Sequence, residues 1–229
     1  MENLLLKYMS KGMGEGEAMQ PCGSAPVVTI SREFGCPSKL IAYMLSEALN
    51  KRNVSGTTAK WHFLNKELLE ESAKELELKP VDLNYLLSSI EKGLFEDILA
   101  SFSQTYVNNF KIRKTLFKIT RSIAQKGNVI LVGRGGAVVL KGCPNSLHIR
   151  LQAPLGWRIQ SVAQLKSISQ QEALNLIVET DKKRKALFEL LLGEKFDTTL
   201  FDLIFNCERF SKEEIVASII RIMELKKMI

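Results

Sequence analysis

A short apolar segment followed by a helical pattern does most to limit the folds open to this chain. The run Val27–Ile30 is rich in β-branched residues, and Gly35 and Pro37 follow it, as is typical of a buried strand that ends in a loop. From Ser38 onward, apolar residues recur at helical spacing. A strand, a loop and a helix within about 25 residues form the opening unit of a doubly wound or mononucleotide-binding fold.

The rest of the chain continues this alternation of strands and helices. Residues 1–25 lack clear periodicity and are interpreted as an N-terminal extension, so that residues 26–229 form one domain. Residues 80–126 are helical in pattern almost throughout. The alternation predicts a three-layer α/β fold, in which helices cover both faces of a parallel sheet of about five strands. Further strands are expected over 61–64, 129–132, 147–151 and 201–205, and helices over 155–166, 169–192 and after Ser211.

Composition narrows the class of partner. The formal net charge of +7 suits an anionic partner, which leaves nucleotides, nucleic acid and anionic membranes open. No apolar run approaches the ~20 residues of a membrane-spanning helix, and the first residues lack the features of a signal peptide, so we expect a cytoplasmic protein without a membrane partner. The aromatic residues fall at helical core spacing rather than on a basic sheet, which ranks nucleic-acid binding well below nucleotide binding.

The cysteine and histidine inventory bears on metal binding. The chain has four cysteines and two histidines, and no two cysteines have the CxxC spacing of a structural zinc site. We therefore expect no metal ligands among them.

The loop between the first strand and the first helix, Ser31–Lys39, is a candidate phosphate site. Backbone N–H groups of such a loop and of the helix start form an anion site, to which Ser38 could add a hydroxyl and Lys39 an ammonium. An ordinary turn with a capping serine and an exposed lysine explains the same residues. The loop also departs from the GxxxxGK[ST] pattern, because Pro37 has no N–H and Leu40 follows the lysine where a magnesium-binding hydroxyl is usual.

Several segments, in their order along the chain, carry a resemblance to a known family. They are Ile30–Gly35, Phe63–Leu69, Val132–Gly135, Leu147–Pro154 with Arg158 after it, Thr180–Arg184 and Phe201–Asn206. The chain resembles the cytidylate kinase-like family over about residues 26–225. The resemblance implies a P-loop NTPase-like fold, with a helical insert at about 65–126 that binds a nucleoside monophosphate and a lid at about 155–200.

The resemblance also implies an activity and a set of site residues. The activity is phosphoryl transfer from ATP, with Mg²⁺, to CMP or a close relative. The implied catalytic residues are Lys39, Arg158 and Arg184. The implied residues for phosphate binding are Ser31, Arg32, Gly35, Cys36, Ser38 and Lys39. The implied residues for acceptor binding are Asn65, Arg134, Asp181 and Arg184.

Two alternatives stay open at this point. Asn65 stands where the family usually has an aspartate, and the residues one turn after Arg158 lack the further arginine that is common there. With the unusual phosphate loop, these departures favour a second hypothesis: a nucleotide-binding protein of this fold that has lost catalysis and serves in sensing or regulation. Asp181 and Arg184, three residues apart, could also be only an exposed ion pair on one helix face. The oligomeric state stays open.

Overall fold

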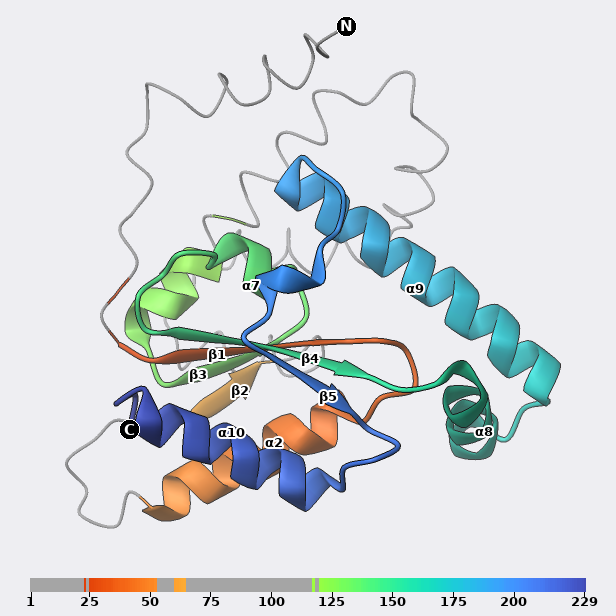
Figure 1. Cartoon of the computed structure of the whole chain (residues 1–229), viewed down its shortest axis with the longest axis horizontal. Coiled ribbons are helices and arrows are strands. Elements are labelled where there is room, and N and C mark those ends of the chain that lie inside the picture. The colour runs from red at the N-terminus through yellow and green to blue at the C-terminus, as the bar shows by residue number, and fades with distance from the viewer. Residues whose placement is uncertain (1–22, 24, 53–59, 65–116, 118–119) are drawn as a thin grey trace, which may run out of the picture.

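A computed structural model describes residues 23, 25–52, 60–64, 117 and 120–229. Five parallel strands form one sheet in the order β2-β3-β1-β4-β5 (Figure 1). They are β1 (Val27–Arg32), β2 (His62–Leu64), β3 (Val129–Val132), β4 (Ser146–Gln152) and β5 (Leu203–Asn206). The predicted α/β fold with a five-stranded parallel sheet is therefore confirmed.

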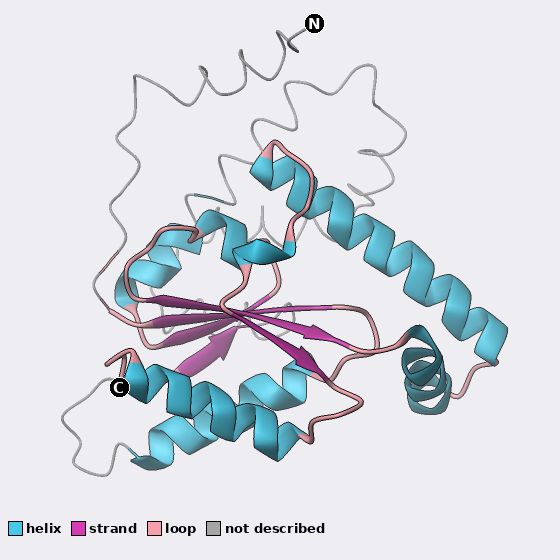
Figure 2. Ribbon diagram, in the orientation of Figure 1, coloured by secondary structure: helices cyan, strands magenta, loops and turns pink. Residues whose placement is uncertain are grey.

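Helices cover both faces of this sheet. Figure 2 shows α2 (Ser38–Arg52) and α10 (Lys212–Leu225) on one face, and α7 (Gly136–Val139) and α9 (Gln170–Leu192) on the other. The helix α8 (Leu155–Lys166) lies beyond the ends of β4 and β5, and a 3-10 turn, Thr198–Leu200, precedes β5. No helix in the part of the chain that the structure describes is long and apolar enough to cross a membrane.

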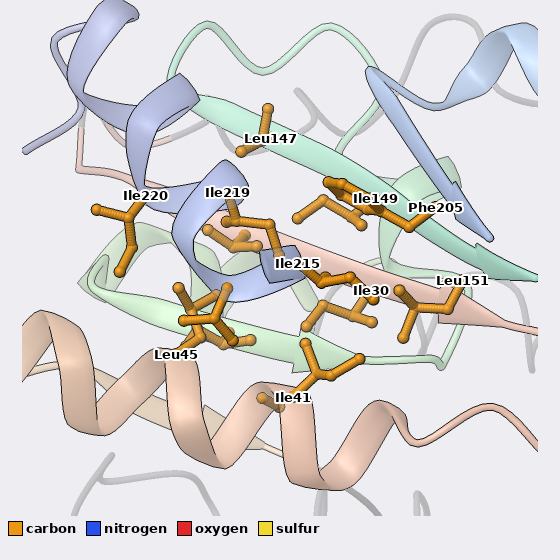
Figure 3. Packing of buried hydrophobic residues seen from close by; sticks show 14 of the residues in the cluster. Ile30, Ile41, Leu45, Leu147, Ile149, Leu151, Phe205, Ile215, Ile219 and Ile220 are labelled. Atoms are coloured by element: carbon orange, nitrogen blue, oxygen red, sulfur yellow. The ribbon is translucent and has the colours of Figure 1, made fainter. Parts of the chain in front are cut away.

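The main core lies between the sheet and the pair α2 and α10. Alternate residues of β1 and β4 point to this face, because side chains alternate along a strand. Figure 3 shows Ile30 and Ile149 of the sheet facing Ile41 of α2 and Ile215 of α10. All four side chains are fully buried, and burial of each contributes about 2 kcal/mol to the free energy of unfolding.

The other face of the same two strands carries polar residues. Thr29 and Ser31 of β1 lie beside His148 and Arg150 of β4, because the parallel register pairs Thr29 with His148 and Ser31 with Arg150. Thr29, Ser31 and His148 are all buried. This polar strip runs toward the ends of the strands, where the site described below is found.

Most predicted boundaries agree with the structure, and one is wrong. The predicted strand 129–132 and helix 155–166 match β3 and α8, and Ser211 caps α10 through a capping box with Glu214. The last strand begins at Leu203 rather than at residue 201. Asp202 lies before the strand, because its carboxylate accepts a hydrogen bond from the backbone N–H of His148 at 2.7 Å. The same carboxylate forms an ion pair with the ammonium of Lys226 at 3.1 Å.

Two predicted segments fall largely beyond this description. Of the N-terminal extension, residues 1–22 and 24 lie outside the described residues, as do residues 65–116, 118 and 119 of the helical insert. Both segments therefore stay predictions.

Candidate functional site: an arginine cluster beside the phosphate loop

Five charged side chains form one alternating chain of ion pairs at the carboxyl ends of the central strands. Glu33 follows β1, Arg150 lies on β4, Arg158 on α8, and Asp181 and Arg184 on α9. The chain runs from Arg150 to Glu33 (3.6 Å), to Arg158 (3.4 Å), to Asp181 (2.6 Å) and to Arg184 (3.7 Å). Four separate elements thus converge on one point at the edge where ligands bind in open α/β sheets.

This network has more positive than negative charge. Three guanidinium groups share two carboxylates, which leaves a surplus of one positive charge within the network. The arginine side chains are only 15% (Arg150), 10% (Arg158) and 26% (Arg184) exposed. Burial lowers the pKa of Arg150 and of Arg184, because loss of water disfavours their charged forms. An anion at this point would relieve that cost.

Arg158 is the central member, and two of its guanidinium nitrogens, Nε and Nη1, donate to oxygens of the protein. Its Nε donates to the carbonyl of Ala153 at 3.0 Å. Its Nη1 donates to the carbonyl of Phe34 at 3.2 Å and to the carboxylate of Asp181 at 2.6 Å. It is the only arginine of the network with a carboxylate on each side, since Glu33 is its other ion-pair partner.

Arg150 lies at one end of the network and is less well satisfied. Its guanidinium carbon is 4.9 Å from the ring centre of Phe196 and 5.6 Å from that of Phe201. Its Nε is buried and has no hydrogen-bond partner. Glu33 is its one ion-pair partner within the network, at 3.6 Å. A buried N–H without an acceptor costs about 1–3 kcal/mol, which favours a site that a further acceptor completes.

Arg184 lies at the other end and reaches the phosphate loop from α9. Its Nη1 donates to the carbonyl of Arg32 at 3.2 Å, and its guanidinium carbon lies 5.4 Å from the ring centre of Phe34. The predicted placement of Asp181 and Arg184 on one helix face is confirmed by their 3.7 Å ion pair. This face turns toward the sheet, so the pair is not merely an exposed one.

The first half of the phosphate loop is held by these same residues. The N–H of Phe34 donates to Asp181 Oδ1 at 2.8 Å, and Glu33 Oε2 accepts the N–H of Ala153 at 3.2 Å. Gly35 has φ of 97°, and a β-carbon there would lie 3.2 Å from the β-carbon of Arg158 and from Cγ2 of Val162. The loop therefore needs glycine at this position both for its backbone conformation and for its close approach to α8.

The end of β3 contributes a second unusual backbone segment. Gly133, Arg134 and Gly135 have φ of 81°, 58° and 66°, so that three consecutive residues are left-handed. A β-carbon on Gly133 would overlap Nη1 of Arg32. Arg134, half-buried, has a conformational cost that glycine would avoid, and such strained residues often cluster at functional sites.

The remaining residues of the predicted phosphate loop are less clearly part of the cluster. Ser38 is buried as the first residue of α2, and Lys39 beside it is exposed. Cys36 lies in the apolar core, in the same buried cluster as Cys207. The neighbouring thiol of Cys207 and burial together raise the pKa of Cys36.

The structure thus unites some of the predicted site residues and adds two that the sequence did not reveal. Arg158, Asp181 and Arg184 meet the loop at Arg32 and Phe34, whereas Asn65 lies outside the described residues. The two additions are Arg150 and Glu33. An arginine between the apolar residues Ile149 and Leu151 of β4 was the available signal, because a charged residue is rarely buried in a strand without a partner.

A pocket of about 230 Å³ opens beside the loop. It lies where Pro37, residues of α8 and the start of α10 meet, and it contains two aromatic side chains, those of Trp157 and Phe210. The thiol-bearing residue Cys207 lines it as well. Among the described residues, no group of three or more His, Cys, Asp and Glu side chains is arranged to hold a metal ion.

A parallel sheet with arginines gathered at the carboxyl ends of its central strands is the architecture of proteins that bind phosphorylated ligands. The chain belongs to the cytidylate kinase-like family, whose sequence model it matches over residues 27–209. The predicted family is therefore confirmed.

Two curated relatives are archaeal cytidylate kinases. The chain is 32% identical to that of Methanopyrus kandleri over 125 residues, which are 51% of this chain and 65% of that protein. It is 33% identical to that of Pyrococcus horikoshii over 95 residues, which are 41% of this chain and 48% of that protein. The chain thus spans less than two thirds of the length of these relatives.

A solved structure agrees on the fold. The crystal structure of an uncharacterized protein from Eubacterium ventriosum matches with a TM-score of 0.60 and 20% sequence identity. The match covers 88% of this chain and 99% of that one. At this identity it shows the fold alone.

Proposed function

We propose that this protein is a nucleoside monophosphate kinase, which transfers a phosphoryl group from ATP to a nucleoside monophosphate. The observation that carries the proposal is the ion-pair network, with its surplus positive charge at the carboxyl ends of β1 and β4. Phosphoryl transfer needs cations gathered at one point, because catalysis is mainly positioning and neutralisation of the charge on the moving group. CMP as the acceptor is proposed by analogy with the archaeal relatives.

Arg150 and Arg184 would contact the phosphoryl groups. Each is an end of the network, with its nearest carboxylate at 3.6 Å or 3.7 Å and shared with Arg158. A guanidinium presents several N–H donors in a planar fork that suits phosphate oxygens. Arg150 also has a free donor in its buried Nε. These two arginines would neutralise charge that develops on the oxygens in the transition state.

The donor nucleotide would lie along the phosphate loop. Ser31, Arg32, Gly35, Cys36, Ser38 and Lys39 stay the proposed phosphate-binding residues. The aromatic side chains of Trp157 and Phe210 would contact the base in the adjoining pocket, since a base can stack on an aromatic ring. Mg²⁺ would enter with the phosphates of ATP and supply further charge neutralisation there. A cytoplasmic location, where ATP and nucleoside monophosphates are at hand, is part of this proposal.

The acceptor would bind on the α9 side of the sheet. Arg134, at the end of β3, is the proposed contact to the acceptor phosphate, and Asn65 the proposed contact within the insert. Arg184 would lie between acceptor and donor, because it reaches the loop from α9. Water must be excluded while the phosphoryl group moves, which is the role proposed for residues 155–200 as a lid.

A turnover screen tests the proposal. Purified protein is incubated with Mg²⁺·ATP and each common nucleoside monophosphate in turn, and ADP and the new diphosphate are quantified by chromatography. We expect ADP formation that depends on one monophosphate and falls at least about tenfold in Arg184→Gln. Lys185→Gln is the matched control, because Lys185 is an exposed neighbour on the same helix. No turnover with any acceptor contradicts the kinase.

A second candidate function has its own support. Pro37 cannot donate an N–H to a phosphate, and Lys39 is exposed at the start of α2. These features favour a nucleotide-binding protein without catalysis, which acts in sensing or regulation. A higher melting temperature with nucleotide, measured by thermal unfolding beside the screen, together with no ADP formation would support this candidate.

A further inference from the structure

The backbone of the phosphate loop is fixed from outside by the helices α8 and α9. Both polar groups that Phe34 presents on its backbone are taken: its N–H by Asp181 at 2.8 Å and its carbonyl by Arg158 at 3.2 Å. Glu33 is tied to the start of α8 through the N–H of Ala153. The hydroxyl of Ser161 reaches the carbonyl of Gly35 at 3.5 Å. Three successive loop residues are thus bound to one helical unit.

Arg158 differs from the other two arginines of the network in how far protein groups already compensate its charge and accept its N–H donors. It lies between two carboxylates, so its charge is compensated, and its side chain is 10% exposed. Its Nε and Nη1 donate to protein oxygens, those of Ala153, Phe34 and Asp181. A group held in this way fixes geometry, whereas Arg150 and Arg184 hold the uncompensated charge.

We propose that Arg158, together with Glu33 and Asp181, is a positioning unit that sets the conformation of the phosphate loop and does not contact the transferred phosphoryl group. Through Asp181 the same unit fixes α9, and with it Arg184, relative to the loop. This role differs from the catalytic one that the family resemblance implies for Arg158. It rests on the proposed function only in taking the loop to be where phosphates bind.

The kind of interaction suggests the decisive substitution. If Arg158 acted only as a positive charge near a phosphoryl group, Arg158→Lys would leave the loop amides unchanged and keep part of the activity. A lysine cannot reproduce bonds from Nε to Ala153 and from Nη1 to both Phe34 and Asp181, because its ammonium is a single compact donor group. A positioning role therefore predicts that lysine fails nearly as badly as methionine.

The first readout is amide hydrogen exchange of the loop, which does not depend on any activity. Exchange of the amides of residues 33–36 is measured in the wild type, Arg158→Lys, Asp181→Asn and the control Lys185→Gln. We expect the Phe34 amide to exchange at least about tenfold faster in the first two variants, because each loses a charge-assisted contact that holds the loop. The control should match the wild type. If Arg158→Lys fails to fold, the exchange rates of Asp181→Asn alone test the proposal.

The second readout is nucleotide turnover by the same variants. We expect Arg158→Lys to raise KM and lower kcat together, because a displaced loop weakens binding and misplaces the donor. Unchanged loop exchange in both Arg158→Lys and Asp181→Asn overturns the proposal. So does an Arg158→Lys variant that exchanges like the wild type and loses kcat alone. If the wild type has no turnover, the kinase proposal fails, and the exchange experiment still decides the positioning role.

Discussion

The guanidinium of Arg32 packs directly on the α-carbon of Gly133, in the space that a β-carbon of any other residue would fill. This contact joins the end of β1 to the end of β3, at the edge where the arginines gather. Gly133 also has φ of 81°, in the left-handed region that favours glycine.

Gly133→Ala should therefore do more harm than backbone strain alone. We expect it to lower the free energy of unfolding by about 1–2 kcal/mol, because a left-handed alanine costs about 1 kcal/mol and the guanidinium at the end of the Arg32 side chain must also shift. Urea unfolding measures the change. Gly142→Ala is the matched control, because Gly142 has φ of 80° and a β-carbon added there would meet nothing within 4 Å. Equal losses in the two variants would mean that the Arg32 contact is unimportant.

The guanidinium of Arg150 should lower the free energy of unfolding and yet be necessary for nucleotide binding. Methionine in its place keeps the contacts with Phe196 and Phe201 and removes a buried charge whose Nε has no acceptor. We expect Arg150→Met to leave the free energy of unfolding unchanged or raise it by about 1 kcal/mol, while nucleotide affinity falls at least about tenfold. Thermal unfolding with and without CMP checks both effects. A variant that is less stable yet binds CMP normally contradicts this role.

His148 should make stability depend on pH. Its ring lies between the hydroxyls of Thr29 (2.8 Å) and Ser146 (3.2 Å), and burial lowers its pKa, although the carboxylate of Asp202 opposes that shift. The unfolded chain then binds a proton below about pH 6.5 that the folded chain resists. The contribution of this histidine is present above that pH and is lost as the pH falls.

The measurement for His148 is urea unfolding between pH 5 and 7.5. The wild type should lose stability on acidification by up to about 1.4 kcal/mol per pH unit more than His148→Gln does, because glutamine does not titrate. The comparison with the variant removes the contribution of every other titrating group. Parallel pH profiles for the two proteins would show that His148 does not carry this dependence.

Glycine and proline residues at the ends of helices and strands explain which boundaries of the fold could be predicted from the sequence. Gly133 ends β3 and Pro154 precedes α8, so both boundaries follow from the sequence. The predicted start of β5 is too early, because the apolar Phe201 precedes Leu203–Phe205 with only Asp202 between them. The carboxylate of Asp202 lies outside the strand pairing: it accepts the backbone N–H of His148, 54 residues earlier, and pairs with Lys226.

The site was harder to predict than the fold, because it is formed by contacts between residues that lie far apart in the sequence. Helical spacing places Asp181 and Arg184 on one face, but only packing decides that this face meets a loop 147 residues earlier, where Asp181 accepts the N–H of Phe34. The family resemblance found Arg158 without its surroundings. Its place between Glu33 and Asp181 is the basis of the positioning role proposed above, and no local pattern contains that information.

The central claim is that the arginines at the ends of the network recognise phosphate. Isothermal titration of the wild type with CMP and with cytidine tests it directly, since the two ligands differ only in the phosphate. We predict that CMP binds at least about tenfold more tightly than cytidine, and that Arg150→Gln and Arg184→Gln each reduce this preference while Lys185→Gln keeps it. Equal affinities for CMP and cytidine, or a preference for CMP that neither arginine substitution reduces, would contradict the account.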